Sequence, residues 1–203
     1  MEFQRTRVIS TGGEQQQIMN HQSTGVYTNR YSPMRLDWME WISANGPYDF
    51  HLSTSFVRDY SESVARSHFN YFIHRLNQEL YGKKYKQRGF YLQGLVFMER
   101  QARGAIHYHG LIKHDDIFCA DDNRSFESYV MNMLPEIREM DFITKKHTGR
   151  SVFNDKGVKV DAVWYEAGII DYLTKMVPLM NGDSIGILGA KGVEWGDVAS
   201  KHV

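Results

Sequence analysis

Two apolar segments separated by a short polar turn constrain the fold of this chain more than any other feature. Residues 90–98 and 105–112 are rich in the residue types that favour strands, and residues 100–104 between them are polar or small. Because so short a connection can join only antiparallel strands, the two segments predict a hairpin. The fold should therefore contain an antiparallel sheet.

Regular patterns on both sides of this hairpin predict further strands and helices. Residues 50–56 alternate large apolar with mostly small polar side chains, which indicates a half-buried strand. Residues 61–80 place apolar side chains at steps of three and four, so one stripe of a long helix packs inward, and Gly82 is placed to end it. Shorter patterns predict helices over 36–42 and 125–134, an irregular or strand-like basic segment over 142–153, a strand over 158–163, and a helix over 162–177 that Asp161 caps and Pro178 ends.

The length of 203 residues suits one substantial core and argues against two full domains. We expect a polar N-terminal arm over residues 1–35, one domain over residues 36–178, and a loose, glycine-rich tail over residues 179–203. Residues 186–192 contain three glycines and a lysine, but at the wrong spacing for a nucleotide-binding phosphate loop. No helicase domain is therefore expected.

The charges of the chain balance, with 24 Lys and Arg against 24 Asp and Glu. A chain of zero net charge is not expected to coat duplex DNA or a membrane through bulk electrostatics, although a local basic groove is still compatible with it. The single cysteine, Cys119, rules out an intramolecular disulfide, and no segment has the roughly 18 apolar residues that span a bilayer. We expect a cytoplasmic protein without a membrane partner.

The pair His107 and His109 is the first candidate for chemistry. Residues two apart on a strand point to the same face, so the two imidazoles would lie side by side as a metal clamp requires. Glu99, at the end of the preceding strand, is the expected third ligand, with Gln93 and Glu166 as weaker substitutes. This mixed nitrogen and oxygen set suits Mn or Mg, while ligand type alone leaves Zn or Fe open. By itself, such a histidine pair is more often incidental than functional.

Tyr172 and Lys175 form the second candidate, one turn apart on one face of the late helix. A phenol has an ordinary pKa of about 10, so it is a poor nucleophile at neutral pH unless a metal or a cation stabilises its anion. Lys175 is the obvious local cation. The plain alternative is a solvated pair on a helix surface.

Taken together and in order, residues 50–56, the His107–Tyr108–His109 triplet and the Tyr172-to-Lys175 motif resemble the three motifs of the HUH endonucleases. The resemblance is to the rolling-circle replication initiators of plasmids, phages and single-stranded DNA viruses, and it covers residues 48–178. It implies an α+β fold, a central antiparallel sheet of the ferredoxin-like or RRM-like type flanked by helices.

The resemblance also implies a reaction. Tyr172 would attack a phosphodiester of single-stranded DNA and keep the 5′ phosphate, Lys175 would assist, and His107, His109 and Glu99 would hold the divalent ion. The expected partners are single-stranded DNA or an origin hairpin and a separate host helicase. Transposases and mobilisation relaxases share this chemistry, and a module that binds a DNA hairpin without cutting it is the alternative of another class.

Two basic segments are candidates for gripping DNA, because cations and aromatic rings together suit a single strand. Solvated loops are the alternative. Tyr165, seven residues before Tyr172, is expected to pack or to stack on DNA, with a second nucleophile as a weaker reading; His51, His68, His74 and His114 are expected to be ordinary histidines. The expected DNA contacts are Lys83, Lys84, Tyr85, Lys86, Arg88, Lys145, Lys146 and Arg150.

Overall fold

The structure, a computed structural model, describes residues 31–101, 104–113, 125–140, 144, 146–175, 184–189 and 191–196. Within them the α-helices are α1 (Pro33–Ala44), α2 (Glu62–Tyr81), α3 (Tyr85–Arg88), α4 (Phe126–Met133) and α5 (Glu166–Thr174). The strands are β1 (Phe50–Ser55), β2 (Gln93–Arg100), β3 (Ile106–Lys113), β4 (Arg138–Met140), β5 (His147–Ser151), β6 (Lys159–Ala162), β7 (Ile185–Gly189) and β8 (Gly192–Trp195).

The fold is α+β, with a six-stranded antiparallel sheet flanked by helices, as the sequence predicts. The strand order is β6-β1-β3-β2-β7-β8, an arrangement compatible with a ferredoxin-like fold. The predicted hairpin is β2–β3, which lies in the middle of the sheet with Glu99 directly opposite His107. β4 and β5 form a separate two-stranded ribbon.

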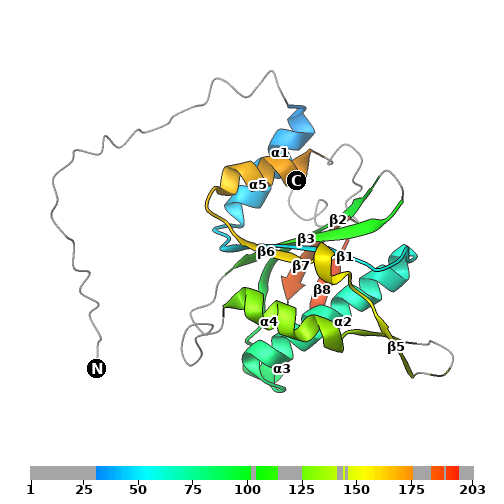
Figure 1. Ribbon diagram of the computed structural model, residues 1–203. Helices are drawn as coiled ribbons and strands as arrows, with labels where there is room; N and C mark the ends of the chain where they lie inside the picture. Colours follow the sequence, from blue (N-terminus) through cyan, green and yellow to red (C-terminus); the bar gives the residue numbers. More distant parts are fainter. Residues whose placement is uncertain are drawn as a thin grey trace, which may run out of the picture. The chain divides into compact units, whose positions relative to one another are not determined.

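Helices cover both faces of the sheet. Figure 1 shows α2, α3 and α4 on one side of it and α1 and α5 on the other. On the α2 face, alternate strand residues such as Leu52 and Tyr108 pack against Phe69 and Phe72 of α2. On the other face, Leu95, Phe97 and Leu111 of the strands pack against α1 and α5. Successive residues of one strand therefore contribute to different cores.

Local sequence signals explain where several elements begin and end. α1 begins after Ser32, whose hydroxyl accepts a hydrogen bond from the Arg35 amide, and Pro33 occupies the first turn. α2 spans the predicted segment and ends at Gly82, where φ is +82°, a backbone conformation that favours glycine. Within the described residues, no helix has both the length and the apolar composition that crossing a membrane requires.

Three expectations about the elements need correction. The late helix begins at Glu166 rather than Ala162, because Asp161 and Ala162 extend β6 and pair with β1. Tertiary strand pairing outweighs the capping signal of an aspartate here. The region 179–203 is not a loose tail throughout, since β7 and β8 add two strands to the edge of β2. Residues 1–30 of the expected arm lie outside the described residues, and Pro33–Arg35 begin α1.

Candidate active site

The histidine pair lies on β3, the strand between β1 and β2. Tyr108 points into the core beneath α2, so His107 and His109 point to the opposite face, the one that α1 and α5 cover. His109 is buried and His107 is half-buried. The predicted strand and shared face are thus confirmed, while the role of the two side chains as ligands stays a prediction.

Of the three side chains considered as a third ligand, Glu99 is the one beside the pair. It lies opposite His107 in the strand register, and its Oε2 atom is 2.9 Å from Nε2 of His109. Gln93 lies six residues away on β2, about 20 Å along the strand. Glu166 begins α5, close to Gly46. In the strand register, Gln93 is too far along β2 to share an ion with His107 and His109.

His109 is held in its neutral form at neutral pH. Burial lowers the pKa of its imidazole, the charge of Lys175 lowers it further, and the hydrogen bond and charge of Glu99 act in the opposite direction. Neutral imidazole is the form that binds metals. The electrostatics of the site therefore leave the nitrogen lone pair of His109 available for coordination.

The donor chemistry of these residues fits a divalent ion. Two imidazoles and a carboxylate come from adjacent, directly paired strands, and the Glu99 and His109 donor atoms already approach each other on one side of the ring. In the part of the chain that the structure describes, no group of three His, Cys, Asp or Glu side chains is yet arranged to hold a metal. The hydrogen bond between Glu99 and His109 would have to give way to coordination.

Tyr172 and Lys175 approach this histidine from α5. The rings of Tyr172 and His109 meet edge to face, with centroids 5.8 Å apart and an interplanar angle of 76°. The Lys175 Nζ atom lies 3.6 Å from the centroid of the Tyr172 ring. Tyr172 is 41% exposed, so its ring is open to a substrate while it contacts His109. Two motifs separated by more than sixty residues in the chain thus come together in one place.

α1 fixes the position of the helix that carries Tyr172. The Arg35 guanidinium donates to the Asp171 carboxylate at 2.7 Å and to the Asp171 backbone carbonyl at 2.6 Å. Below this contact, Ile42 of α1 and Ile170 and Leu173 of α5 share the core of this face. Because the Arg35 side chain binds both the backbone carbonyl and the carboxylate of Asp171, α5 is anchored to α1 at the residue next to Tyr172.

His51 is a site residue that sequence reasoning missed, since we expected an ordinary histidine there. Its Nε2 atom lies 3.2 Å from Nδ1 of His109, and the two ring planes are within 7° of each other with centroids 5.4 Å apart. Burial and then the neighbouring His109 lower the pKa of His51 to about 4, while Asp161 acts in the opposite direction. The alternation in β1 was the available signal, because it places His51 on the face opposite to Leu52.

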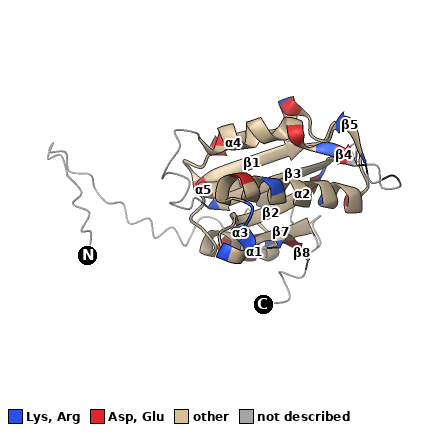
Figure 2. Ribbon diagram, turned by 90° about the horizontal axis from the view of Figure 1, so that it is seen from below, with Lys and Arg blue, Asp and Glu red and all other residues tan. Residues whose placement is uncertain are grey.

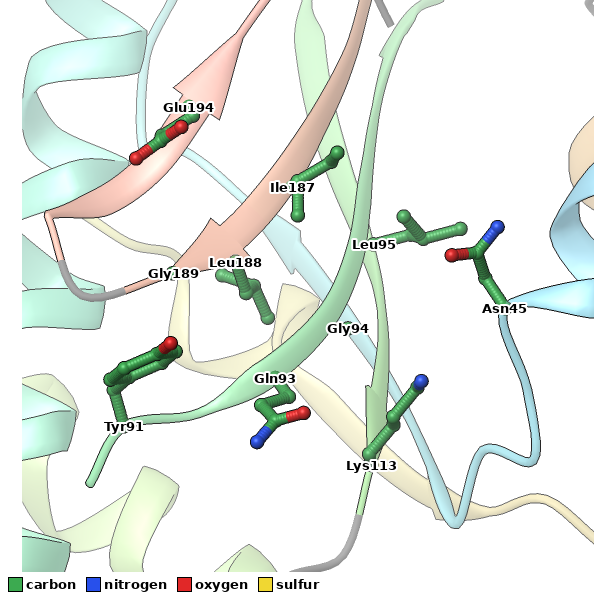
Figure 3. A pocket seen from close by; sticks show the side chains of 10 residues that line it. All are labelled: Asn45, Tyr91, Gln93, Gly94, Leu95, Lys113, Ile187, Leu188, Gly189 and Glu194. Carbon is green, nitrogen blue, oxygen red and sulfur yellow. The ribbon is translucent and has the colours of Figure 1, made fainter. Parts of the chain in front are cut away.

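Cavities open beside the sheet among the described residues. A cavity of about 290 Å³ adjoins His107 and is lined by Phe56, Val57, Arg58, Asp59, Ala105, Ile106 and His107. A second, of about 420 Å³, lies at the far end of β2 and is drawn in Figure 3. Its lining comes from β2, β3, β7, β8 and the segments beside them: Asn45, Tyr91, Gln93, Gly94, Leu95, Lys113, Ile187, Leu188, Gly189 and Glu194.

The first basic segment does not lie on the face that carries the histidines. Lys83, Lys84, Lys86 and Arg88 are exposed, but they flank or form α3, which packs beside α2 on the opposite side of the sheet (Figure 1). Tyr85 is 1% exposed and its hydroxyl is 2.7 Å from Nδ1 of His74. The expected stacking of Tyr85 on DNA is therefore wrong for this conformation, because neither ring face is open.

The second basic segment lies on the β4–β5 ribbon. Lys146 and Arg150 are exposed, and Figure 2 shows basic residues at this ribbon; Lys145 lies outside the described residues. The end of the ribbon is hydrogen-bonded to the segment that follows β1, because the Val57 amide donates to the Val152 carbonyl. β1 ends opposite His107, so this segment attaches at the histidine end of the sheet.

Tyr165 precedes α5 instead of lying within it. Its φ of −137° is not helical, so a spacing of seven residues does not place it on the same helical face as Tyr172. The ring packs over Gly168, where a side chain would clash with it, and 71% of the residue stays exposed. The neighbouring Trp164 is 93% exposed. These two rings offer an open aromatic surface at the start of the helix that carries Tyr172.

Comparisons of the chain with protein-family models, with curated proteins and with solved structures found no match. What the site does must therefore be inferred from its own geometry and from its motifs.

Proposed function

We propose that the protein is a metal-dependent endonuclease that nicks and rejoins single-stranded DNA at a specific site. The observation that carries this proposal is that Tyr172 contacts both His109 and the Lys175 ammonium. A phenol, a cation and a neutral imidazole beside a carboxylate are the groups that attack on a phosphodiester requires.

Each side chain has a distinct part in this reaction. Tyr172 Oη bonds to phosphorus, the bond from phosphorus to the 3′ oxygen breaks, and the phenol proton is lost while the departing oxygen gains one. Lys175 stabilises the negative charge that passes from the phenolate to the phosphate. His107, His109 and Glu99 would hold Mn or Mg, which when bound polarises the phosphate as a Lewis acid. The product is a 5′-phosphotyrosine with a free 3′ hydroxyl, so the step can be reversed to rejoin strands.

The surroundings of the site favour a single strand as substrate. The cavity beside His107 offers space for a nucleotide next to the phosphate, and exposed Lys146 and Arg150 lie on the ribbon attached at that end. Zero net charge fits an enzyme that grips one short unpaired segment. We infer initiation of rolling-circle replication of a phage, plasmid or satellite in the cytoplasm, with a separate host helicase; transposition and mobilisation would use the same chemistry.

A covalent-adduct experiment tests this proposal. The full chain is incubated with Mn²⁺ and both strands of the genetic element that encodes it, as fragments labelled at the 3′ end, because the tyrosine keeps the 5′ phosphate of the labelled product. We expect a labelled protein that survives denaturation in detergent and that disappears in Tyr172→Phe. Tyr165→Phe is the matched control and should retain the adduct. His107→Ala should abolish the adduct while leaving much DNA binding intact.

The possible failures have different meanings. An adduct that persists in Tyr172→Phe and is lost in Tyr165→Phe would move the nucleophile to Tyr165. DNA binding without any cleavage, while Mn²⁺ is measurably bound, would favour a module that grips a DNA hairpin without cutting it.

A further inference from the structure

We propose that His51 is a positioning residue for His109: it holds the imidazole ring and exchanges its own tautomer so that His109 can change from a hydrogen-bond donor to a metal ligand. This inference rests on the proposed function, because it requires a divalent ion at Nε2 of His109.

The two nitrogens of the His109 ring have different partners on opposite sides. Nε2 is 2.9 Å from the Glu99 carboxylate, and Nδ1 is 3.2 Å from Nε2 of His51. An ion shared with Glu99 would lie on the Nε2 side. His51 lies on the other side of the ring, so it acts on that ion through His109 rather than as another ligand.

The protons of the two rings can be followed through the change. A carboxylate only accepts hydrogen bonds, so without metal the His109 proton sits on Nε2, and Nδ1 accepts a hydrogen bond from Nε2–H of His51. Coordination needs the lone pair at Nε2 of His109, so its proton must be on Nδ1 and must be donated to Nε2 of His51. His51 then carries its own proton on Nδ1. Each neutral ring exchanges one tautomer for the other, and no proton is gained or lost overall.

A histidine is well suited to this position because one neutral ring can be donor or acceptor at the same atom. The position of His51 is fixed by β1, in which Ser53 pairs with His109 and His51, two residues before Ser53, points to the same face. The two ring planes are within 7° of each other, so the facing nitrogens can share a hydrogen bond in the plane of both rings. Asp161 lies opposite His51 in the register of β6 and interacts with it electrostatically, so a carboxylate is close to the ring that would carry the Nδ1 proton.

Binding of Mn²⁺ alone to the full chain, measured by calorimetry without DNA, tests the inference. His51→Phe keeps a ring of similar volume but has no polar atom, and we expect it to weaken Mn²⁺ binding about 10–100-fold. His51→Gln keeps both a donor and an acceptor and should restore most of the affinity. His74→Gln, which changes a hydrogen-bonded histidine of α2 on the other face, is the matched control and should bind like the wild type.

A second measurement does not depend on any variant folding. Long-range proton–nitrogen NMR spectra of the wild type with saturating Mg²⁺ should show both His109 and His51 passing from the Nε2–H to the Nδ1–H form. Unchanged tautomers, or a folded His51→Phe that binds Mn²⁺ like the wild type, would overturn the positioning role and leave the proposed function standing. A wild type that binds no Mn²⁺, or whose binding is insensitive to His107→Ala, would overturn both.

Discussion

The two faces of the central sheet are made of alternate residues of the same strands, yet they differ in composition. The face beneath α2 is apolar along the strands, with Leu52, Val96 and Tyr108 buried against aromatic side chains of the helix. The opposite face is mixed: Leu95, Phe97 and Leu111 pack against α1 and α5, and ionisable side chains stand among and beside them, including His51, Glu99, His107 and His109. We infer that the α2 face mainly stabilises the fold. On the opposite face, ionisable side chains of the proposed site occupy positions that apolar side chains could otherwise fill.

The sharpest test of this division compares one residue from each face. Phe69→Ala should lower the free energy of unfolding by about 3–5 kcal/mol, because the ring is fully buried against Phe72 and Tyr108 and its loss leaves a cavity. Tyr172→Phe removes one exposed hydroxyl and should change stability by less than about 0.5 kcal/mol while abolishing adduct formation. Urea unfolding followed by circular dichroism measures both. Equal destabilisation by the two variants would mean that Tyr172 is a packing residue.

The contact between α1 and α5 should have a smaller effect on stability and a selective effect on activity. Arg35→Ala should cost about 1–2 kcal/mol, since the guanidinium is partly buried and its loss leaves the Asp171 carboxylate and carbonyl without this donor. It should also slow adduct formation more than it weakens DNA binding, because α5 carries Tyr172.

The matched control for Arg35 is Arg75 of α2, whose ion pair with Glu136 is more exposed. Arg75→Ala should change stability by less than about 0.5 kcal/mol and leave the rate of adduct formation unchanged. A similar loss of rate in both variants would count against a positioning role for Arg35.

The fold could be predicted from the sequence wherever a pattern has one period and a clear end. The alternation over residues 50–56 and the three-four spacing before Gly82 correspond to β1 and α2. The sequence patterns gave the wrong structure where a helix-capping signal competes with strand formation, or where a strand forms only by pairing with a segment distant in the sequence. Asp161 looks like a helix cap until β1 provides a strand partner for it, and β7 and β8 become strands because the edge of β2 accepts them.

The site could be predicted in part for the same reason. Side chains two residues apart on a strand point to the same face, so the sequence alone places His107 and His109 together. The contact of His51 with His109 depends on β1 lying beside β3, which no local pattern specifies. Likewise, the basic residues before α3 have a composition suited to DNA, but composition cannot tell which face of the sheet they occupy.

Lowering the pH should destabilise the folded protein, and His68, a buried residue of α2, should contribute to this loss. Burial, and then the charge of Arg58, lower the pKa of this histidine in the folded state below its ordinary value of 6.5. Between the folded and the ordinary pKa the unfolded chain binds more protons, so stability rises with pH and is lost as pH falls below about 6.5. His68→Gln, which stays neutral, should narrow the difference between urea midpoints at pH 7 and pH 5. An unchanged or wider difference would show that His68 keeps an ordinary pKa in the fold.

The smallest expected effect is on the salt dependence of DNA binding in variants of Arg150 and Lys84. It tests which face of the sheet the DNA strand crosses. Arg150 lies on the ribbon attached at the histidine end of the sheet, whereas Lys84 precedes α3 on the α2 side. Each phosphate contact contributes about 0.7 to the slope of the logarithm of single-strand affinity against the logarithm of salt concentration. Arg150→Gln should therefore reduce that slope by about 0.7 and Lys84→Gln should leave it unchanged, measured by fluorescence anisotropy in a Tyr172→Phe background so that no DNA is cut. The reverse result would route the strand over α3, so DNA would have to pass around the sheet edge to reach Tyr172.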